Sequence, residues 1–379
     1  MFIVLLACTP DPDPGKQLDA SPGDSGKPGD TADTGEAPTY EGCRATPGAA
    51  DRDRVVVVSL PYGSGGAQAK TYALLTLSAS GELSDRGTRF EMGRAYSGEV
   101  VFTPDGSLGL VPQDDGSVGV FLADGTVVDP GFGEFYASKV VVDPSGEFAW
   151  VVDGNWANNG GGIYRVDIDC TTGELTGETR VIEAKLPADI VVRDGMAVVA
   201  GLEVPGSAAG DDAALLSWGD SIEFVAGVDA FGDDEAIVTD AHWNGDYLFI
   251  ADYSEFSGVP TRVAVVDTRD QLDAYAVVDV EDPVALVPAG DLVLVISGYG
   301  DAVFAISADG GTSAARVASS ELPGGGVVVS RGALDGLVLV AEVSGLRTLR
   351  VEGSTVTDEG VFSLGGGYTG ITGAVGVQP

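Results

Sequence analysis

The feature that most constrains the fold is a repeated unit in which an apolar run, a tight glycine turn and a second apolar run follow one another. Residues 99–113 (EVVFTPDGSLGLVPQ) and 139–153 (KVVVDPSGEFAWVVD) are two examples. The turn glycines of the six units are Gly106, Gly146, Gly195, Gly245, Gly290 and Gly336. Turns such as Asp-Gly and Ser-Gly supply the positive φ that tight hairpins need. A spacing of 40 to 50 residues between these glycines is typical of a β-propeller with one four-stranded blade per repeat.

Each pair of apolar runs is followed by a third strand and a more polar fourth strand, as in GGIYRVDIDCTTGEL and GETRVIEA. We expect the apolar first strands to lie inside the ring and the polar fourth strands at its rim. There are six turns but seven sets of later strands, because the first set, from residue 54, has no first strand before it. We expect residues 371–377 to supply it. The prediction is an all-β, seven-bladed β-propeller of four-stranded antiparallel blades, closed by this C-terminal strand.

The charge of the chain limits its partners. It has 58 acidic and 20 basic residues and a net charge of −38, which argues against nucleic acid and against anionic membrane surfaces as direct partners. The Asp-rich stretches 30–35 and 232–235 lack the calcium-loop pattern with its terminal Glu. We therefore expect no metal and no cofactor, although a divalent cation stays an alternative, and we expect a monomer.

The N-terminal residues indicate a location rather than a fold. Residues 1–8 (MFIVLLAC) are too short for a membrane helix and lack the basic start of a signal peptide. Residues 5–8 (LLAC) resemble a bacterial lipobox, which implies cleavage before Cys8 and diacylglycerol on its thiol. Residues 9–50 hold eight acidic residues and seven prolines, a composition typical of a disordered tether. The folded propeller is expected over 51–379.

This order of segments is that of a bacterial surface lipoprotein. The residue after Cys8 is not Asp, so the resemblance implies an outer-membrane lipoprotein of the cell envelope, facing the periplasm or the cell surface. The missing basic start indicates a start codon further upstream. The alternative is a frayed apolar N-terminus without lipid.

Two further cysteines remain, Cys43 and Cys170. In an oxidising compartment they could form one disulfide. The alternative is two unrelated thiols.

The repeats VFTPDGSLGLV and VVVDPSGEFAWVVD resemble blades of the YVTN/lactonase-like seven-bladed propellers, and the resemblance covers residues 54–379 as architecture. It implies the fold. The family includes sugar-lactone hydrolases and also surface propellers without known chemistry, and a full set of lactonase catalytic residues has no match in this chain.

The sequence contains one histidine, His242, close to Asp240 in the segment TDAHWNGD. One interpretation is an acid/base group or metal ligand near the central channel. The other is a polar residue where an inner strand runs into its turn. Because no catalytic motif is complete, we expect no enzymatic activity.

The loops between the second and third strands are long, and they lie on the same face as the connections between blades. They carry aromatic residues beside amides, a composition suited to recognition on a rigid scaffold. The candidate ligand-binding residues of this face and the nearby channel are Tyr62, Asn155, Trp156, Asn158, Asp240, His242, Tyr253, Phe256 and Tyr299. The alternative is that the aromatics cover the ends of the core.

Together these features predict a lipid-anchored envelope propeller that binds a glycan, peptide or protein through its long-loop face and touches the membrane only through its lipid. One alternative is a lactonase-like hydrolase with its site at the mouth of the central channel. Another is a passive structural surface protein. Two or three carboxylates or amides converging with His242 at the channel entrance would favour the hydrolase, and a broad mouth without convergent ionisable groups would favour binding.

Overall fold

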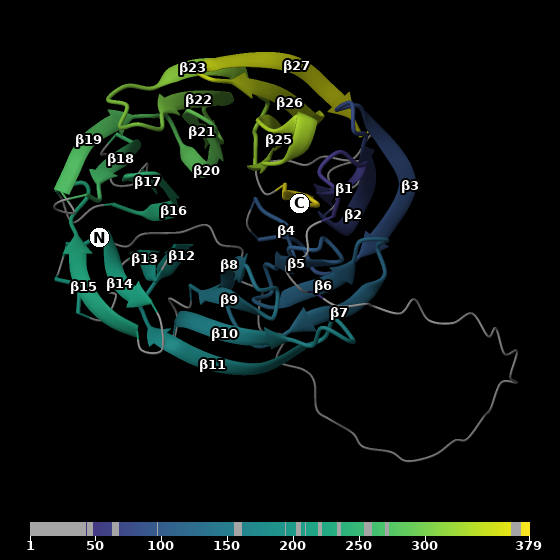
Figure 1. Cartoon of the computed structure of the whole chain (residues 1–379), viewed down its shortest axis with the longest axis horizontal. Coiled ribbons are helices and arrows are strands. Elements are labelled where there is room, and N and C mark those ends of the chain that lie inside the picture. The colour runs from purple at the N-terminus through teal and green to yellow at the C-terminus, as the bar shows by residue number, and fades with distance from the viewer. Residues whose placement is uncertain are drawn as a thin grey trace, which may run out of the picture. The chain divides into compact units, whose positions relative to one another are not determined.

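The computed structural model describes Cys43 and residues 48–379, apart from 63–67, 97, 155–160, 194, 202–205, 209, 219–221, 233–235, 254–259, 270–272 and 365–372. For residues 61, 62, 68, 69 and 273 it describes the backbone alone. Contacts separate Tyr40–Pro379 as one compact unit, and this unit is a ring of four-stranded antiparallel sheets (Figure 1). No helix in the described residues has the length and apolar character needed to cross a membrane.

The described strands form seven sheets of four strands each, as the repeats predict. The first three blades are β28 (Val375–Val377), β1 (Arg54–Tyr62), β2 (Gln68–Leu77), β3 (Leu83–Glu91); β4 (Val101–Phe102), β5 (Leu108–Pro112), β6 (Val118–Leu122), β7 (Val127–Phe132); and β8 (Ala137–Val142), β9 (Phe148–Asp153), β10 (Gly162–Ile168), β11 (Leu175–Glu183). The next two are β12 (Pro187–Arg193), β13 (Met196–Gly201), β14 (Ala213–Trp218), β15 (Ile222–Val228); and β16 (Val238–Asn244), β17 (Tyr247–Asp252), β18 (Arg262–Asp267), β19 (Asp273–Asp279). The last two are β20 (Pro283–Ala289), β21 (Leu292–Ser297), β22 (Ala302–Ser307), β23 (Ala315–Ser319); and β24 (Gly325–Val329), β25 (Leu337–Glu342), β26 (Gly345–Glu352), β27 (Thr355–Ser363), with a 3₁₀ turn η2 (Gly332–Leu334).

The six glycine turns behave as predicted. All six turn glycines have positive φ, from 57° at Gly245 to 80° at Gly336. Glycine adopts this backbone region without the steric cost that a Cβ brings. The turns therefore set the register of each inner hairpin.

The apolar side chains are buried between blades. Seven buried clusters of the described residues lie at the seven blade-to-blade interfaces; for example, Val56 and Leu339 share one cluster and Leu108 and Val151 another. The second strands are almost fully buried, whereas an outer strand such as β27 is mostly exposed. The predicted inner and outer strands are confirmed, and the inner strands line the centre of the ring.

The predicted ring closure is confirmed, with a shorter strand than expected. β28 pairs antiparallel with β1, placing Val377 opposite Val56 and Val375 opposite Val58. Residues 371 and 372 lie outside the described residues. Gln378 adds to the seam, because its backbone N–H donates to the Val55 carbonyl at 2.9 Å and its side-chain Oε1 accepts from the Val55 N–H at 3.0 Å.

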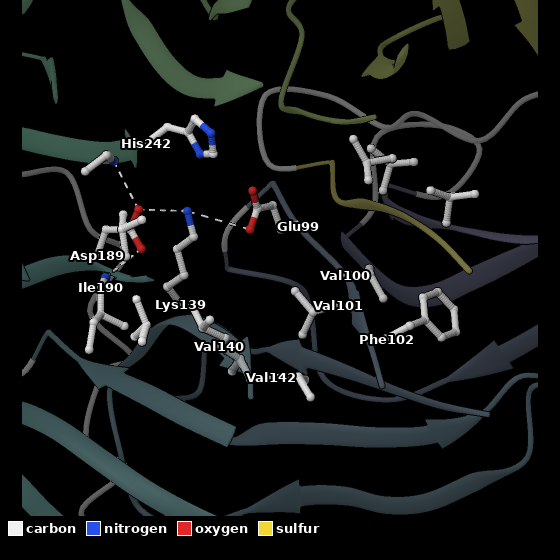
Figure 2. A pocket seen from close by; sticks show the side chains of 17 residues that line it. Glu99, Val100, Val101, Phe102, Lys139, Val140, Val142, Asp189, Ile190 and His242 are labelled. Carbon is white, nitrogen blue, oxygen red and sulfur yellow. Dashed lines mark hydrogen bonds and ion pairs between the residues drawn. The ribbon is translucent and has the colours of Figure 1, made fainter. Parts of the chain in front are cut away.

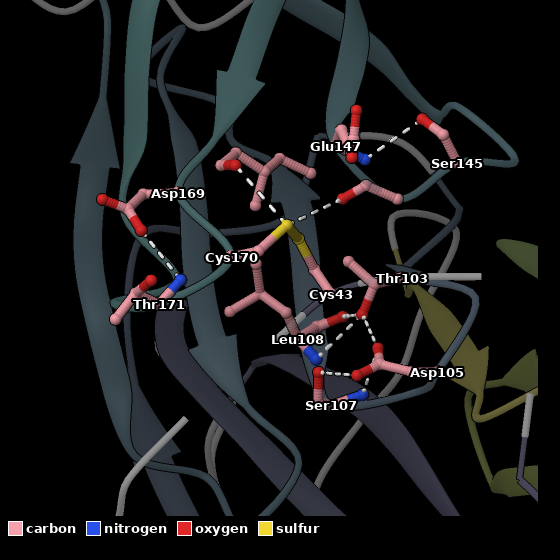
Figure 3. Close-up of a disulfide and its surroundings, with 12 residues drawn as sticks. Cys43, Thr103, Asp105, Ser107, Leu108, Ser145, Glu147, Asp169, Cys170 and Thr171 are labelled. Atoms are coloured by element: carbon pink, nitrogen blue, oxygen red, sulfur yellow. Dashed lines mark hydrogen bonds between the residues drawn. A yellow bond between two sulfur atoms is a disulfide. The ribbon is translucent and has the colours of Figure 1, made fainter. Parts of the chain in front are cut away.

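Cys43 and Cys170 are joined in a disulfide, so the pairing that the sequence left open is present (Figure 3). Cys43 is fully buried and belongs to the cluster between the second and third blades. Cys170 lies in the turn between β10 and β11. A Cβ at Gly146, the turn glycine of the same blade, would overlap the Cys43 carbonyl oxygen. The bond fixes the chain to the third blade before β1 begins in the first.

Candidate functional site

A cavity of about 430 Å³ lies among the inner strands (Figure 2). Most of its wall is apolar and comes from strands of different blades, including Val101, Val141, Val191, Val327 and Val377. Its polar lining consists of Glu99, Lys139, Asp189 and His242. A mainly apolar cavity with a few convergent polar groups is the usual form of a small-molecule site.

Lys139 is the centre of the polar end. Its Nζ lies 2.6 Å from Asp240 Oδ1, 2.9 Å from Asp189 Oδ2 and 3.7 Å from Glu99 Oε2. The side chains of Asp189 and Asp240 are 1% and 6% exposed, whereas that of Glu99 is 30% exposed. Residues of four adjacent blades thus meet around one ammonium group.

The repeat explains why these side chains converge. Lys139, Asp189 and Asp240 are each the third residue of an inner strand, and each follows an irregularity in the pairing with the second strand. The sixth blade has the same irregularity, but there the equivalent residue is Ala285. A β-bulge redirects the side chain beside it. The bulges thus place equivalent residues of neighbouring blades at the start of the channel, on the face of the connections between blades.

The two aspartates also hold adjacent blades together. Asp189 Oδ2 accepts a hydrogen bond from the Ala241 N–H at 3.0 Å, and Asp240 Oδ2 accepts one from the Leu286 N–H at 2.6 Å. In each case the donor is on the inner strand of the next blade. Asp189 Oδ1 further accepts from the Ile190 N–H at 2.7 Å. All four aspartate oxygens therefore have donors, which gives these residues a structural role.

Burial and charge act in opposite directions on the ionisable groups. Burial alone would lower the pKa of Lys139, but the surrounding carboxylates outweigh it and hold this pKa well above its usual value. Burial raises the pKa of Asp189, with a further contribution from Asp240. Burial also opposes ionisation of Asp240, yet Lys139 and the backbone donor lower its pKa. Burial raises the pKa of Glu99. Lys139 is consequently a cation at neutral pH and not a base.

His242 lies within β16 and lines the cavity, so it is not a turn residue. The turn begins at Gly245. Burial lowers the pKa of His242 to about 4, so its imidazole is neutral at pH 7 and offers one donor and one acceptor nitrogen. Within the described part of the chain, neither nitrogen has a protein hydrogen-bond partner. The described residues also contain no group of three or more side chains suited to hold a metal ion.

The structure brings two of the sequence-predicted residues to this site, Asp240 and His242. Tyr299 is 58% exposed after β21 and Tyr253 is half-buried after β17; neither lines the cavity. Asn155, Trp156, Asn158, Phe256 and the side chain of Tyr62 lie outside the described residues, as does Cys8. The long-loop recognition surface therefore stays a prediction.

Sequence reasoning missed Glu99, Lys139 and Asp189, although a signal was present. Each is the charged residue that opens an apolar inner-strand run: EVVF, KVVV and DIVV. A charge at the start of a run that is otherwise buried is costly unless it is paired. The same charged position in consecutive repeats indicates that the charges pair with one another across the ring.

No protein-family model matches the chain, and no curated protein matches it. Among solved structures, a functionally unknown protein from Desulfotomaculum acetoxidans has 13% identity and a TM-score of 0.55, covering 85% of this chain and 98% of that one. Apo AztD from Citrobacter koseri has 11% identity and a TM-score of 0.52, covering 87% and 99%. A putative 6-phosphogluconolactonase from Bacteroides uniformis has 12% identity and a TM-score of 0.43, covering 81% and 82%. At these identities the likeness to the first two structures establishes the fold alone, and the third carries no argument. The protein is a seven-bladed β-propeller.

Proposed function

We propose that this propeller is a binding module whose central cavity takes a small organic ligand. The observation that carries the proposal is the cavity of about 430 Å³ with apolar walls and a single polar end formed by Glu99, Lys139, Asp189 and His242. Its volume is in the range typical of small-molecule sites. Because Lys139 is already paired with two carboxylates at short distance, phosphorylated or otherwise anionic ligands are disfavoured.

The test is binding of a small neutral amphiphile, hexan-1-ol, measured by ligand-observed saturation-transfer NMR. We expect saturation transfer with the wild type and its loss in Val191→Phe, which adds a ring to the cavity wall. Val361→Phe makes the same change on an outer strand, where Val361 is 38% exposed, and should bind as the wild type does. Equal signals from the wild type and Val191→Phe would contradict the proposal.

Hydrolysis of a neutral lactone is the second candidate, because carboxylates and His242 do converge at the channel. The aspartate oxygens are occupied by Lys139 and backbone N–H groups, which leaves Glu99 to activate a water molecule and the imidazole N–H of His242 to donate a hydrogen bond to the oxyanion. The net reaction would add water to the lactone and give the hydroxy acid. Acid release from glucono-δ-lactone in a pH-stat, lost in Glu99→Gln, would support it. A rate equal to the uncatalysed one would leave binding alone.

We further propose that the ring is held in the bacterial cell envelope by a lipid on Cys8, through a tether over residues 9–50. The lipobox-like LLAC supports this, and the disulfide is in keeping with an oxidising compartment outside the cytoplasm. In a bacterial host, radiolabelled palmitate should label the wild type but not Cys8→Ala. Unlabelled wild-type protein that retains Met1 would rule out the anchor.

A further inference from the structure

We propose that the ligand of the cavity is an organic cation, an alkylammonium-type molecule whose charged nitrogen lies beside Glu99 and His242 and whose apolar body lies along the valine walls. This inference rests on the proposed function and names its ligand class. Three observations support it: the excess of acidic side chains at the polar end, the hydrogen-bond acceptors that Glu99 and His242 can offer to a ligand, and the apolar walls of the cavity.

The polar end has more acidic than basic side chains. The carboxyl groups of Glu99, Asp189 and Asp240 surround the single ammonium of Lys139. The two aspartates hold this ammonium at 2.9 and 2.6 Å, so it has little capacity to bind a ligand anion. The net charge of −38 adds a field that attracts cations and repels anions.

Glu99 has capacity for a ligand. It is the most exposed of the three carboxylates, and its one polar side-chain contact among the described residues is the long one to Lys139, 3.7 Å. Figure 2 shows Glu99, Lys139 and His242 at the same end of the cavity. Hydrogen bonds that involve an ionised group are about twice as strong as those between neutral groups, so an ammonium donor is favoured over a hydroxyl at this place.

His242 supports the same class of ligand. Its imidazole is neutral at pH 7, since burial lowers its pKa to about 4, and it does not repel a cation. A neutral imidazole has one nitrogen that accepts a hydrogen bond. Together, Glu99 and His242 offer two acceptors to one ammonium group, while Val101, Val141 and Val191 provide contact for a hydrocarbon chain.

The experiment compares three probes of equal chain length, hexylammonium, hexan-1-ol and hexanoate, by NMR titration of the full ring. We expect hexylammonium to bind about tenfold more tightly than the alcohol, and hexanoate to bind most weakly. In Glu99→Gln the affinity for hexylammonium should fall about tenfold, to that of the alcohol, while the affinity for the alcohol stays unchanged. Glu147→Gln is the matched control, because Glu147 is exposed in the turn before β9. It should change neither the affinity for hexylammonium nor that for hexan-1-ol.

Two measurements on the wild type keep the test independent of the stability of the variant. Raising the salt concentration should weaken the binding of hexylammonium but not the binding of hexan-1-ol. Lowering the pH should weaken the binding of hexylammonium, because Glu99 becomes protonated. This loss should begin above the pH at which an exposed glutamate titrates, because burial raises the pKa of Glu99. If hexan-1-ol binds as tightly as hexylammonium or more tightly, the proposal of a cationic ligand is wrong, whereas the proposed small-molecule binding function is still supported. Binding of none of the probes would overturn both.

Discussion

A chain that ends at residue 372 should lose about 8 kcal/mol of stability and fail to form a closed ring. The deletion removes β28, including fully buried Ala374 and Val375. It also removes seam hydrogen bonds, among them Ser59 N–H to the Ala374 carbonyl at 2.8 Å and Arg54 Nη1 to the Gln378 carbonyl at 3.0 Å. At about 1 kcal/mol per hydrogen bond and about 2 kcal/mol for a buried valine, the loss is comparable to the whole stability of a typical domain.

Thermal unfolding followed by circular dichroism, together with size-exclusion chromatography, measures this effect. We expect a transition lowered by more than 10 °C and association through the exposed edge of β1. A synthetic peptide of residues 371–379, added in excess, should restore the transition, and a scrambled peptide should not. An unchanged melting curve for the truncated chain would show that β28 does not hold the ring closed.

Loss of the Cys43–Cys170 disulfide should destabilise the ring by about 5 kcal/mol. The bond joins residues 127 positions apart, and closing a loop of this length restricts the unfolded chain by roughly that amount in the chain-entropy treatment. The measurement is the midpoint of urea unfolding for the double variant Cys43→Ser/Cys170→Ser. The variant also loses part of the buried packing around Cys43, which lies in the cluster between the second and third blades.

The matched control separates these two contributions. The wild type unfolded in the presence of a reducing agent keeps both sulfur atoms, so it should lose most of the 5 kcal/mol without the loss of packing. Cys8→Ser should behave as the wild type. Equal midpoints for oxidised and reduced wild type would show that the bond contributes nothing to stability.

The fold could be predicted from the sequence because each level of the pattern agrees with the others. The turn glycines give the period, the apolar runs give the inner strands, and the unpaired first set of strands requires a strand from elsewhere in the chain. The exact extent of that strand could not be predicted. β28 spans only Val375–Val377, since Ala374 continues the contact with β1 through hydrogen bonds to Ser59, one of them to the Ser59 side chain, rather than as a regular ladder residue.

The site was less predictable. Asp240 and His242 were identified from a short stretch that contains the single histidine, which is a local signal. The contacts of Lys139 with Asp189 and Asp240 join positions 50 and 101 residues apart, and they exist because the ring places equivalent residues of neighbouring blades side by side. A search for motifs along the chain does not reveal such contacts. Alignment of the repeats on their turn glycines would have revealed the charged position.

The closure of blade one has a consequence for the order of events during synthesis. Ala374 and Ser59, which exchange hydrogen bonds in the seam, are 315 residues apart. At the usual rate of translation, β28 is synthesised roughly 15 to 60 s after β1, the strand with which it pairs. During this interval the edge of β1 is open to pairing with other chains. The ring therefore cannot close before residues 375–377 have been made, and until then blade one can contain only β1, β2 and β3.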